Sequence, residues 1–167
     1  MVSSKWIYKI KHTTAGSIEK YKTKFVVHGF SEKDGIDYEE TFSPVARYTS
    51  IRTIIVLASK TECKLHQMNV KATFLNGVIE KQVYIEQPQC FEVKERRTHV
   101  CKLKKDMYRL KQSPRAWFGI IDSFLMNLGF TKSKVDPNLY FKVMDDEHVI
   151  LLLYVYDLIM KGNEKQI

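Results

Sequence analysis

The sequence has no hydrophobic segment long enough to cross a membrane. Its longest strongly apolar run, residues 149–156, covers eight residues and ends at Asp157, whereas a membrane-spanning helix needs about 20. The N-terminal segment Met-Val-Ser-Ser-Lys-Trp also lacks the apolar stretch of a secretory signal peptide. We therefore expect no transmembrane segment and no membrane partner.

Cysteine is scarce, with three residues in a chain of 167: Cys63, Cys90 and Cys101. Three cysteines are too few for a disulfide framework, and the odd number is typical of a reducing compartment. Cys63 and Cys101 could combine with His66 and His99 as four zinc ligands. That set lacks a paired Cys-x-x-Cys knuckle, and a single residue separates His99 from Cys101. We therefore expect no zinc site.

Acidic residues are outnumbered, with 19 Asp and Glu against 27 Lys and Arg and a net charge of +8. The basic residues gather in two stretches, 5–33 and 96–115. Each Lys or Arg that neutralises a phosphate releases condensed counterions, so such clusters suit a polyanion such as a nucleic acid. A solvated basic surface explains the same charge, and the charge alone leaves both interpretations open.

Length and patterning predict one globular α+β domain. A chain of 167 residues with 44% hydrophobic residues fits a single domain and is not globally disordered. Apolar spacing predicts one helix at 49–61 and another that starts near residue 113. Strand-like segments fall at 6–11, 18–30, 64–70, 83–85, 100–103, 139–143 and 149–160. Strands and helices occur in runs rather than in alternation, which favours α+β over a doubly wound sheet.

The second helix carries the clearest local signals. Ser113 is a candidate N-cap, Pro114 fits the first turn, and Gly129 fits the position just past the end. The face that we expect it to bury consists of Trp117, Ile120, Ile121, Phe124, Leu125 and Leu128.

Seven short motifs follow one another along the chain. They are Lys-Trp-Ile-Tyr-Lys-Ile-Lys at 5–11, Ile-Asp-Tyr-Glu-Glu-Thr-Phe-Ser-Pro-Val-Ala at 36–46, Leu-His-Gln-Met at 65–68, Phe-Leu-Asn-Gly at 74–77, Val-Tyr-Ile-Glu-Gln-Pro at 83–88, Leu-Lys-Gln-Ser-Pro-Arg-Ala-Trp at 110–117 and Leu-Leu-Tyr-Val at 152–155. In order and spacing they resemble the reverse transcriptase, an RNA-directed DNA polymerase, of copia-type LTR retrotransposons. Colinear motifs over residues 5–163 are far more specific than one short pattern.

The resemblance implies the fingers and palm of a right-hand polymerase, with an antiparallel palm sheet backed by helices. Residues 1–48 would be mainly fingers, and residues 49–167 palm with interleaved fingers segments, within a single reverse transcriptase domain. The thumb, connection and ribonuclease H regions would follow residue 167, so the chain resembles a fragment of a polyprotein that also carries an integrase. The implied location is intracellular, in cytoplasmic virus-like particles or the nucleus.

The resemblance also implies two-metal nucleotidyl transfer. Two Mg²⁺ ions about 3.5–4 Å apart activate the primer 3′-hydroxyl and clamp the triphosphate. In the family, their carboxylates come from an Asp after a Gln-Met pair and from a Tyr-Val-Asp-Asp turn between two strands. Asn69 and Tyr156 stand at two of these three positions, and Asp157 alone is intact. Val70 would offer its backbone carbonyl to a metal. We expect Asn69 and Asp157 on neighbouring strands, with Tyr156 at a hairpin tip.

These departures predict an inactive copy with impaired Mg²⁺ binding. A neutral amide oxygen replaces a carboxylate poorly on Mg²⁺, and a tyrosine phenol stays protonated near neutrality. No substitute acid is evident, since Asp145 and Asp146 fall in a predicted turn and Asp106 and Asp122 in other elements. A non-catalytic basic module that binds nucleic acid, or a pseudogene product without function, are the alternatives.

Four residues match the family's contacts to template and nucleotide, and would meet an RNA or DNA primer–template and dNTPs. Lys22 and Lys24 resemble fingers residues that contact the incoming triphosphate, although the family usually has Arg at the position of Lys24. Phe74 resembles the aromatic residue that screens the sugar 2′-position, and Gln112 lies in the segment near the template. Solvated lysines and a core aromatic are the plain alternatives.

Two further positions depart from the family pattern. Ala72-Thr73 reverses the usual Thr-Ala order, and Arg109 follows Tyr108 where Gly is usual. We expect Arg109 to strain its turn if the backbone there requires the conformational freedom of glycine.

Overall fold

The structure, a computed structural model, describes residues 1–77, 79, 81–96, 98–144 and 147–162. The chain divides into two compact units, Met1–Thr41 with Phe74–Ala116 and Phe42–Thr73 with Trp117–Ile167. Each unit is therefore built from two separate stretches of sequence. No helix among the described residues combines the length and apolar character needed to cross a bilayer.

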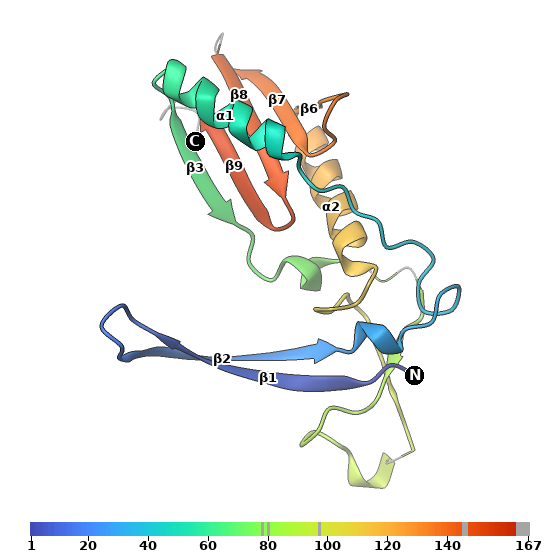
Figure 1. Cartoon of the computed structure of the whole chain (residues 1–167). Coiled ribbons are helices and arrows are strands. Elements are labelled where there is room, and N and C mark those ends of the chain that lie inside the picture. Colours follow the sequence, from blue (N-terminus) through green and yellow to red (C-terminus); the bar gives the residue numbers. More distant parts are fainter. Residues whose placement is uncertain (78, 80, 97, 145–146, 163–167) are drawn as a thin grey trace. The chain divides into compact units, whose positions relative to one another are not determined.

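The first unit consists mainly of strands and short helical turns. Its elements are β1 (Ser4–His12), β2 (Ile18–Val27), the 3-10 turn η1 (Gly29–Ser31), β4 (Tyr84–Ile85), the 3-10 turn η3 (Lys94–Arg96) and β5 (Cys101–Lys102). β1 and β2 form a long antiparallel hairpin, drawn in blue in Figure 1. Its register places Lys9 opposite Lys22 and Lys11 opposite Lys20, so these lysines share one face of the ribbon. This confirms strands at the segments predicted at 6–11 and 18–30, although β2 ends at Val27.

A small apolar core fixes the base of this hairpin. It is formed by Val2, Val27, Val83, Ile85 and Leu110, each at most 2% exposed. These residues come from four separate places in the sequence, so the core ties β2 and β4 to the segment that leads into the second helix.

The second unit is built around a five-stranded antiparallel sheet. Its elements are α1 (Tyr48–Lys60), β3 (Lys64–Asn69), α2 (Ser113–Asn127), β6 (Thr131–Lys132), β7 (Leu139–Met144), β8 (Glu147–Tyr154) and β9 (Asp157–Gly162). The first turn of α2 falls in the first unit, and the 3-10 turn η2 (Thr73–Asn76) begins at the boundary between the two stretches of sequence. The strand order is β3-β9-β8-β7-β6. The combination of helices and antiparallel strands agrees with the predicted α+β class.

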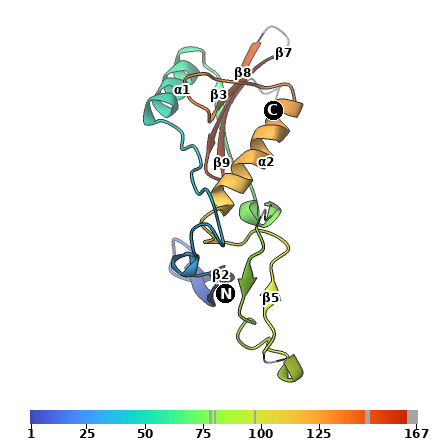
Figure 2. The same ribbon diagram turned by 90° about the vertical axis from the view of Figure 1, so that its right-hand side faces the viewer.

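Helices cover both faces of this sheet, as Figure 2 shows for α1 and α2. Ile150 and Leu152 of β8 pack with Ile54 of α1 on one face. Val149 and Leu151 alternate with them and are also buried, toward the other face. Double burial explains why β8 is a continuous apolar run rather than an alternating one.

The two ends of α2 were predicted with different success. Gly129 lies just past the helix with a φ of +84°, and its N–H donates to the carbonyl of Met126 at 2.9 Å, which confirms the predicted stop. The hydroxyl of Ser113, predicted as the N-cap, instead donates to the carbonyl of Met107 at 2.9 Å. Ser113 is itself the first helical residue.

The buried stripe of α2 is narrower than predicted. Trp117, Ile121 and Leu125 are buried, at an i, i+4 spacing that forms one line along the helix. The other three expected core residues, Ile120, Phe124 and Leu128, are exposed, which corrects that part of the prediction.

The start of α1 is held by an acid distant in sequence. The buried carboxylate of Asp136 accepts hydrogen bonds from the backbone N–H of Arg47 (3.0 Å) and the hydroxyl of Ser50 (2.6 Å). Burial alone would raise the pKa of Asp136, but these bonds and those from Asn138 lower it overall. Asp136 therefore stabilises the helix N-terminus as an anion.

Candidate active site

The hairpin turn between β8 and β9 carries the sequence motif predicted to hold metal. Tyr154 pairs with Asp157, so Val155 and Tyr156 form a two-residue turn. Val155 has a φ of +57°, which is rare for a β-branched residue. Hydrophobic patterning predicted one strand over 149–160 because neither turn residue is a usual turn former. That prediction is wrong, whereas the family motif placed Tyr156 at a hairpin tip correctly.

β3 brings the other predicted metal position beside this turn. Asn69, the last residue of β3, pairs with Asp157, the first residue of β9. The side-chain amide nitrogen of Asn69 donates to a carboxylate oxygen of Asp157 at 2.9 Å, although 88 residues separate them. The N–H of Val70 donates to the carbonyl of Tyr156 at 3.0 Å. The predicted proximity of Asn69 and Asp157 is confirmed.

Two buried side chains that were not predicted as site residues hold this region in place. The indole N–H of Trp117 donates to the carbonyl of Val155 at 2.9 Å, and the Trp117 side chain is 4% exposed. The hydroxyl of Thr73 donates to the carbonyl of Val70 at 2.6 Å, and Thr73 is 3% exposed. Trp117 was predicted as a core residue, and its spacing gave no sign of the bond to the turn.

The residues at the turn do not fit a pair of divalent cations. Asp157 contributes a carboxylate, but Asn69, at a position where the family motif predicts a lost ligand, turns amide hydrogens toward it. Amide hydrogens carry partial positive charge and would repel a cation. Across the described parts of the chain, no three His, Cys, Asp or Glu side chains gather as metal ligands. Two ions would need more than the single carboxylate of Asp157 to hold them.

The acids considered as substitutes do not change this conclusion. Asp122 accepts hydrogen bonds from the hydroxyl of Tyr140 and the ammonium of Lys132, both at 2.7 Å. Asp106 is completely buried and belongs to the first unit. Asp145 and Asp146 lie outside the described residues.

The predicted nucleotide contacts Lys22, Lys24, Phe74 and Gln112 all belong to the first unit. The ammonium of Lys24 lies 4.2 Å from the ring centroid of Tyr108, a cation–π contact. Phe74 meets the same Tyr108 ring edge-on, with centroids 5.5 Å apart. The structure thus joins Lys24 and Phe74 through Tyr108, which was not predicted as a site residue.

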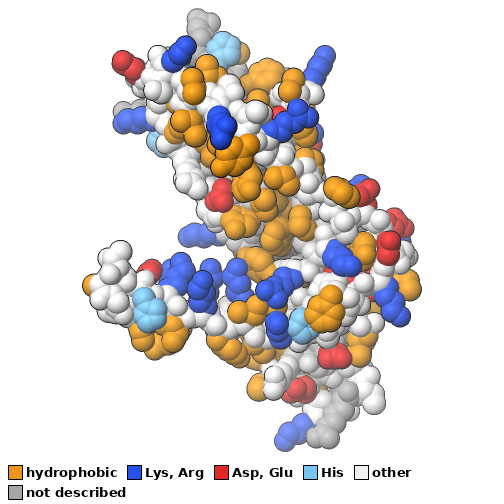
Figure 3. Space-filling view, viewed as in Figure 1, with side chains coloured by type: hydrophobic (Ala, Val, Ile, Leu, Met, Phe, Trp, Pro, Cys, Tyr) orange, Lys and Arg blue, Asp and Glu red, His pale blue; other side chains and the backbone are white. Residues whose placement is uncertain are grey.

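Positive charge is concentrated along the β1–β2 hairpin. Figure 3 shows basic side chains gathered there, and all of those in residues 4–27 are lysines. The charge of Lys24 is the main cause of a lowered pKa at Lys22, with burial and then Lys11, Lys20 and Lys9 adding to it. Directly opposed like charges on paired strands are destabilising. A bound polyanion would relieve this repulsion.

Gln112 lies in a network around a buried acid. Its side-chain amide donates to the carbonyl of Asp37 at 3.4 Å. The carboxylate of Glu32, 5% exposed, accepts the backbone N–H of Lys111 at 2.9 Å. Burial raises the pKa of Glu32, and the bond from Lys111 partly offsets this. Glu32 thus fixes the backbone beside Gln112, a role that its sequence position did not reveal.

The turn before this segment is strained as predicted. Arg109 has a φ of +74°, in the left-handed region that favours glycine. Its carbonyl oxygen would stand 2.5 Å from a Cβ at position 29, so Gly29 is the residue that lets the two backbones approach.

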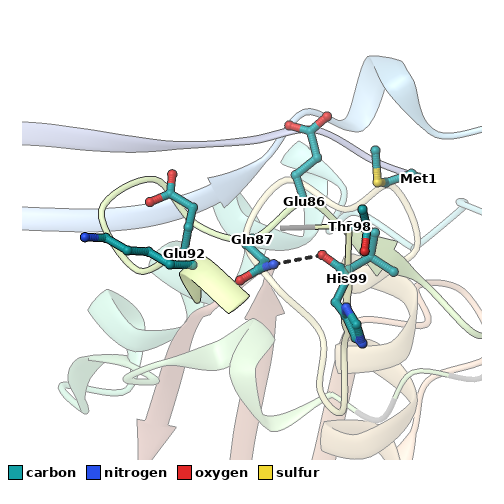
Figure 4. A pocket seen from close by; sticks show the side chains of 8 residues that line it. Met1, Glu86, Gln87, Glu92, Thr98 and His99 are labelled. Carbon is teal, nitrogen blue, oxygen red and sulfur yellow. Dashed lines mark hydrogen bonds between the residues drawn. The ribbon is translucent and has the colours of Figure 1, made fainter. Parts of the chain in front are cut away.

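A cavity of about 570 Å³ lies elsewhere in the first unit (Figure 4). Its lining includes Glu86, Glu92 and Lys94, and the side-chain amide of Gln87 donates to the carbonyl of His99 at 2.9 Å beside it. None of the predicted site residues lines this cavity. It is therefore separate from the candidate site.

Comparison with known proteins gives one consistent family. The sequence profile of the family described as reverse transcriptase (RNA-dependent DNA polymerase) matches residues 1–167. The chain is 44% identical over 162 residues to the retrovirus-related Pol polyprotein from transposon TNT 1-94 of Nicotiana tabacum, covering 96% of the chain and 12% of that protein. It is 38% identical over 164 residues to the corresponding polyprotein from transposon RE1 of Arabidopsis thaliana, covering 98% of the chain and 11% of that protein. The chain thus spans about an eighth or less of these relatives. No solved structure matches the chain.

Proposed function

Because the chain belongs to the reverse transcriptase (RNA-dependent DNA polymerase) family, we propose that its two units are the fingers and palm of a copia-type retrotransposon polymerase. The first unit, with its lysine-bearing hairpin, is the fingers. The second, with its antiparallel sheet and the turn at Val155 and Tyr156, is the palm. Both are interleaved in sequence, as the family motifs predict.

The parent activity is template-directed addition of deoxynucleotides to a primer 3′-hydroxyl. Family members use Mg²⁺ for this reaction, and their carboxylates must hold the ions in place. We propose that this copy does not catalyse it. One observation carries the proposal: Asn69 donates a hydrogen bond to Asp157 at the position where the family has a second carboxylate.

The residues expected to bind the template and nucleotide keep side chains suited to that role. Lys22 and Lys24 present ammonium groups suited to phosphates, and Gln112 is positioned by the network around Glu32. A second function is therefore a fingers–palm module that binds primer–template without extending it. The clustered lysines of the hairpin favour it, because binding a polyanion would relieve their mutual repulsion.

Primer extension measured beside a salt titration of binding tests both functions on the unmodified chain. We expect salt-dependent binding of a primer–template and no extension. Extension would show that the palm is active despite Asn69 and Tyr156. Absence of both binding and extension would support a pseudogene product without function.

A further inference from the structure

We propose that Thr73 is a positioning residue that commits the Val70 carbonyl to a hydrogen bond within the chain. It is then a third obstacle to cation binding, beside Asn69 and Tyr156. The inference rests on the proposed function and on the metal-binding role that the family resemblance implies for the Val70 carbonyl.

Both backbone polar groups of Val70 are engaged inside the chain. Its N–H donates to the carbonyl of Tyr156 at 3.0 Å. Its carbonyl accepts the hydroxyl of Thr73 at 2.6 Å, a short bond for two uncharged groups. Thr73 is 3% exposed and begins η2, so its hydroxyl has little access to water as an alternative partner.

This bond works against a cation in two ways. A carbonyl oxygen has two lone pairs, so the hydroxyl does not exhaust it. However, the hydroxyl hydrogen places positive partial charge beside the oxygen that a cation would approach. Rotating the hydroxyl away would leave a buried donor without a partner, which is unfavourable. A cation at the Val70 carbonyl must therefore disrupt the bond or share the oxygen with it.

The reversed Ala72-Thr73 order accounts for the bond. Ala72 has a φ of +54°, a conformation that disfavours a β-branched residue. The present order keeps threonine out of this position and puts its hydroxyl three residues after Val70, where such side chains commonly bond back to the carbonyl. With the usual order, residue 73 would be alanine and would have no hydroxyl.

Three departures from the family pattern therefore converge on one place. Asn69 pairs with Asp157, and Thr73 pairs with Val70. The third departure, Tyr156, lies between Asp157 and the turn residue Val155, which Trp117 holds. The Asp157 carboxylate and the Val70 carbonyl, which would face cations in the parent enzyme, each accept a hydrogen bond from a neighbouring side chain here. These residues therefore fail to fit a two-metal site in one respect beyond the two lost carboxylates, namely the hydrogen bond from Thr73 to the Val70 carbonyl.

Metal titration of restored variants tests this role. In a background that carries Asn69→Asp and Tyr156→Asp, Thr73→Val removes the hydroxyl with little change of shape, and Thr73→Ser keeps it. Mg²⁺ affinity, measured by calorimetry, should increase by up to about tenfold with Val, the size of one competing hydrogen bond, and stay unchanged with Ser. Mn²⁺ quenching of Trp117 fluorescence, with Trp6→Phe to remove the other tryptophan, gives a second readout.

Each other result overturns the inference. Equal affinity with Val and Ser, or no Mg²⁺ binding by either, would show that removing the Thr73 hydroxyl does not make the Val70 carbonyl available to a cation. Weaker binding with Val would show that the hydroxyl is a ligand. In the otherwise unmodified chain, Thr73→Val should lower the melting temperature and Thr73→Ser should not, and the absence of that difference would also overturn it. Primer extension by the unmodified chain would refute the proposed inactivity instead, so the two failures are distinguishable.

Discussion

The side-chain amide of Asn69 donates a hydrogen bond to the carboxylate of Asp157, at 2.9 Å across the paired ends of β3 and β9. A second carboxylate at position 69 would face Asp157 directly. In the absence of a cation the two would repel, whereas amide and carboxylate attract. An asparagine at position 69 therefore stabilises the metal-free strand pair.

Asn69→Asp alone should destabilise the metal-free protein by about 1–2 kcal/mol, from the lost hydrogen bond and the opposed charges. Repulsion raises at least one pKa of the new pair, so the folded state holds more protons than the unfolded state above about pH 4. Stability should therefore fall as pH rises through that window and stay low above it. Urea unfolding of both proteins between pH 3 and about 7 measures this.

Asn69→Ala is the matched control, because it removes the hydrogen bond and adds no charge. Its cost should be independent of pH over the same range. A pH-independent deficit in the Asn69→Asp variant would contradict the expected charge repulsion.

The lysines of the β1–β2 hairpin should set the salt dependence of nucleic-acid binding. Replacing Lys20, Lys22 and Lys24 by alanine should flatten the plot of log affinity against log salt, by about 0.9 for each lysine that neutralises a phosphate on duplex. Binding should also be weak and independent of sequence. Fluorescence anisotropy with a labelled primer–template at several salt concentrations measures the slope.

A triple variant with equal loss of charge serves as control for that experiment. Alanine at Lys60, Lys64 and Lys134, which are exposed and outside both basic stretches, should leave the slope nearly unchanged. Equal flattening by both triple variants would mean that the hairpin lysines act only through net charge.

Arg109→Gly should stabilise the protein by about 0.5–1 kcal/mol. The φ of +74° costs a non-glycine residue about 1–2 kcal/mol, and the greater freedom of glycine in the unfolded chain offsets about 0.5–1 kcal/mol. The Arg109 side chain is exposed, so few contacts are lost. Thermal unfolding should show a higher melting temperature.

Gly129→Ala tests the same physics in reverse. Gly129 has a φ of +84°, and an added Cβ would make ordinary contacts of 3.6 and 3.7 Å with Lys142. A lower melting temperature would thus report the backbone conformation rather than crowding. If both variants leave the melting temperature unchanged, left-handed strain is not significant in this chain.

Glu32→Gln should remove part of the pH dependence of stability. Burial raises the pKa of Glu32 in the folded state, so the folded protein binds more protons than the unfolded one above the ordinary pKa of Glu. Stability of the unmodified protein should therefore fall as pH rises through the window up to the raised value. The variant keeps an acceptor for the N–H of Lys111 and should lack this fall. Parallel slopes for both proteins in urea unfolding would contradict it.

Much of the local structure could be predicted from the sequence, because it depends on neighbouring residues. The helix expected at 49–61 is observed at Tyr48–Lys60, and the strand expected at 64–70 is observed at Lys64–Asn69. The turn at Val155 and Tyr156 could not be predicted from patterning. Its positive φ is held by surrounding structure, including the bond from Trp117, rather than by a turn-forming residue.

The sequence predicted which residues of the site lie close together, but it did not predict the hydrogen bonds between them. Family motifs placed Asn69 beside Asp157, yet the hydrogen bond between them depends on strand register. Glu32 and Asp136 were overlooked because charged residues in loops are usually solvated. Their burial depends on partners 79 and 89 residues away, which local patterns do not reveal.

Primer extension by four proteins tests the central claim most directly: the unmodified chain, Asn69→Asp, Tyr156→Asp and the double variant, with Mg²⁺ and then Mn²⁺. A single restored carboxylate leaves either an amide or a phenol at a metal position. Neither single variant therefore holds two metal ions adequately. We predict no extension from the unmodified chain or either single variant, with Mg²⁺ affinity improved in the double variant alone. Robust extension by the unmodified chain would contradict the account.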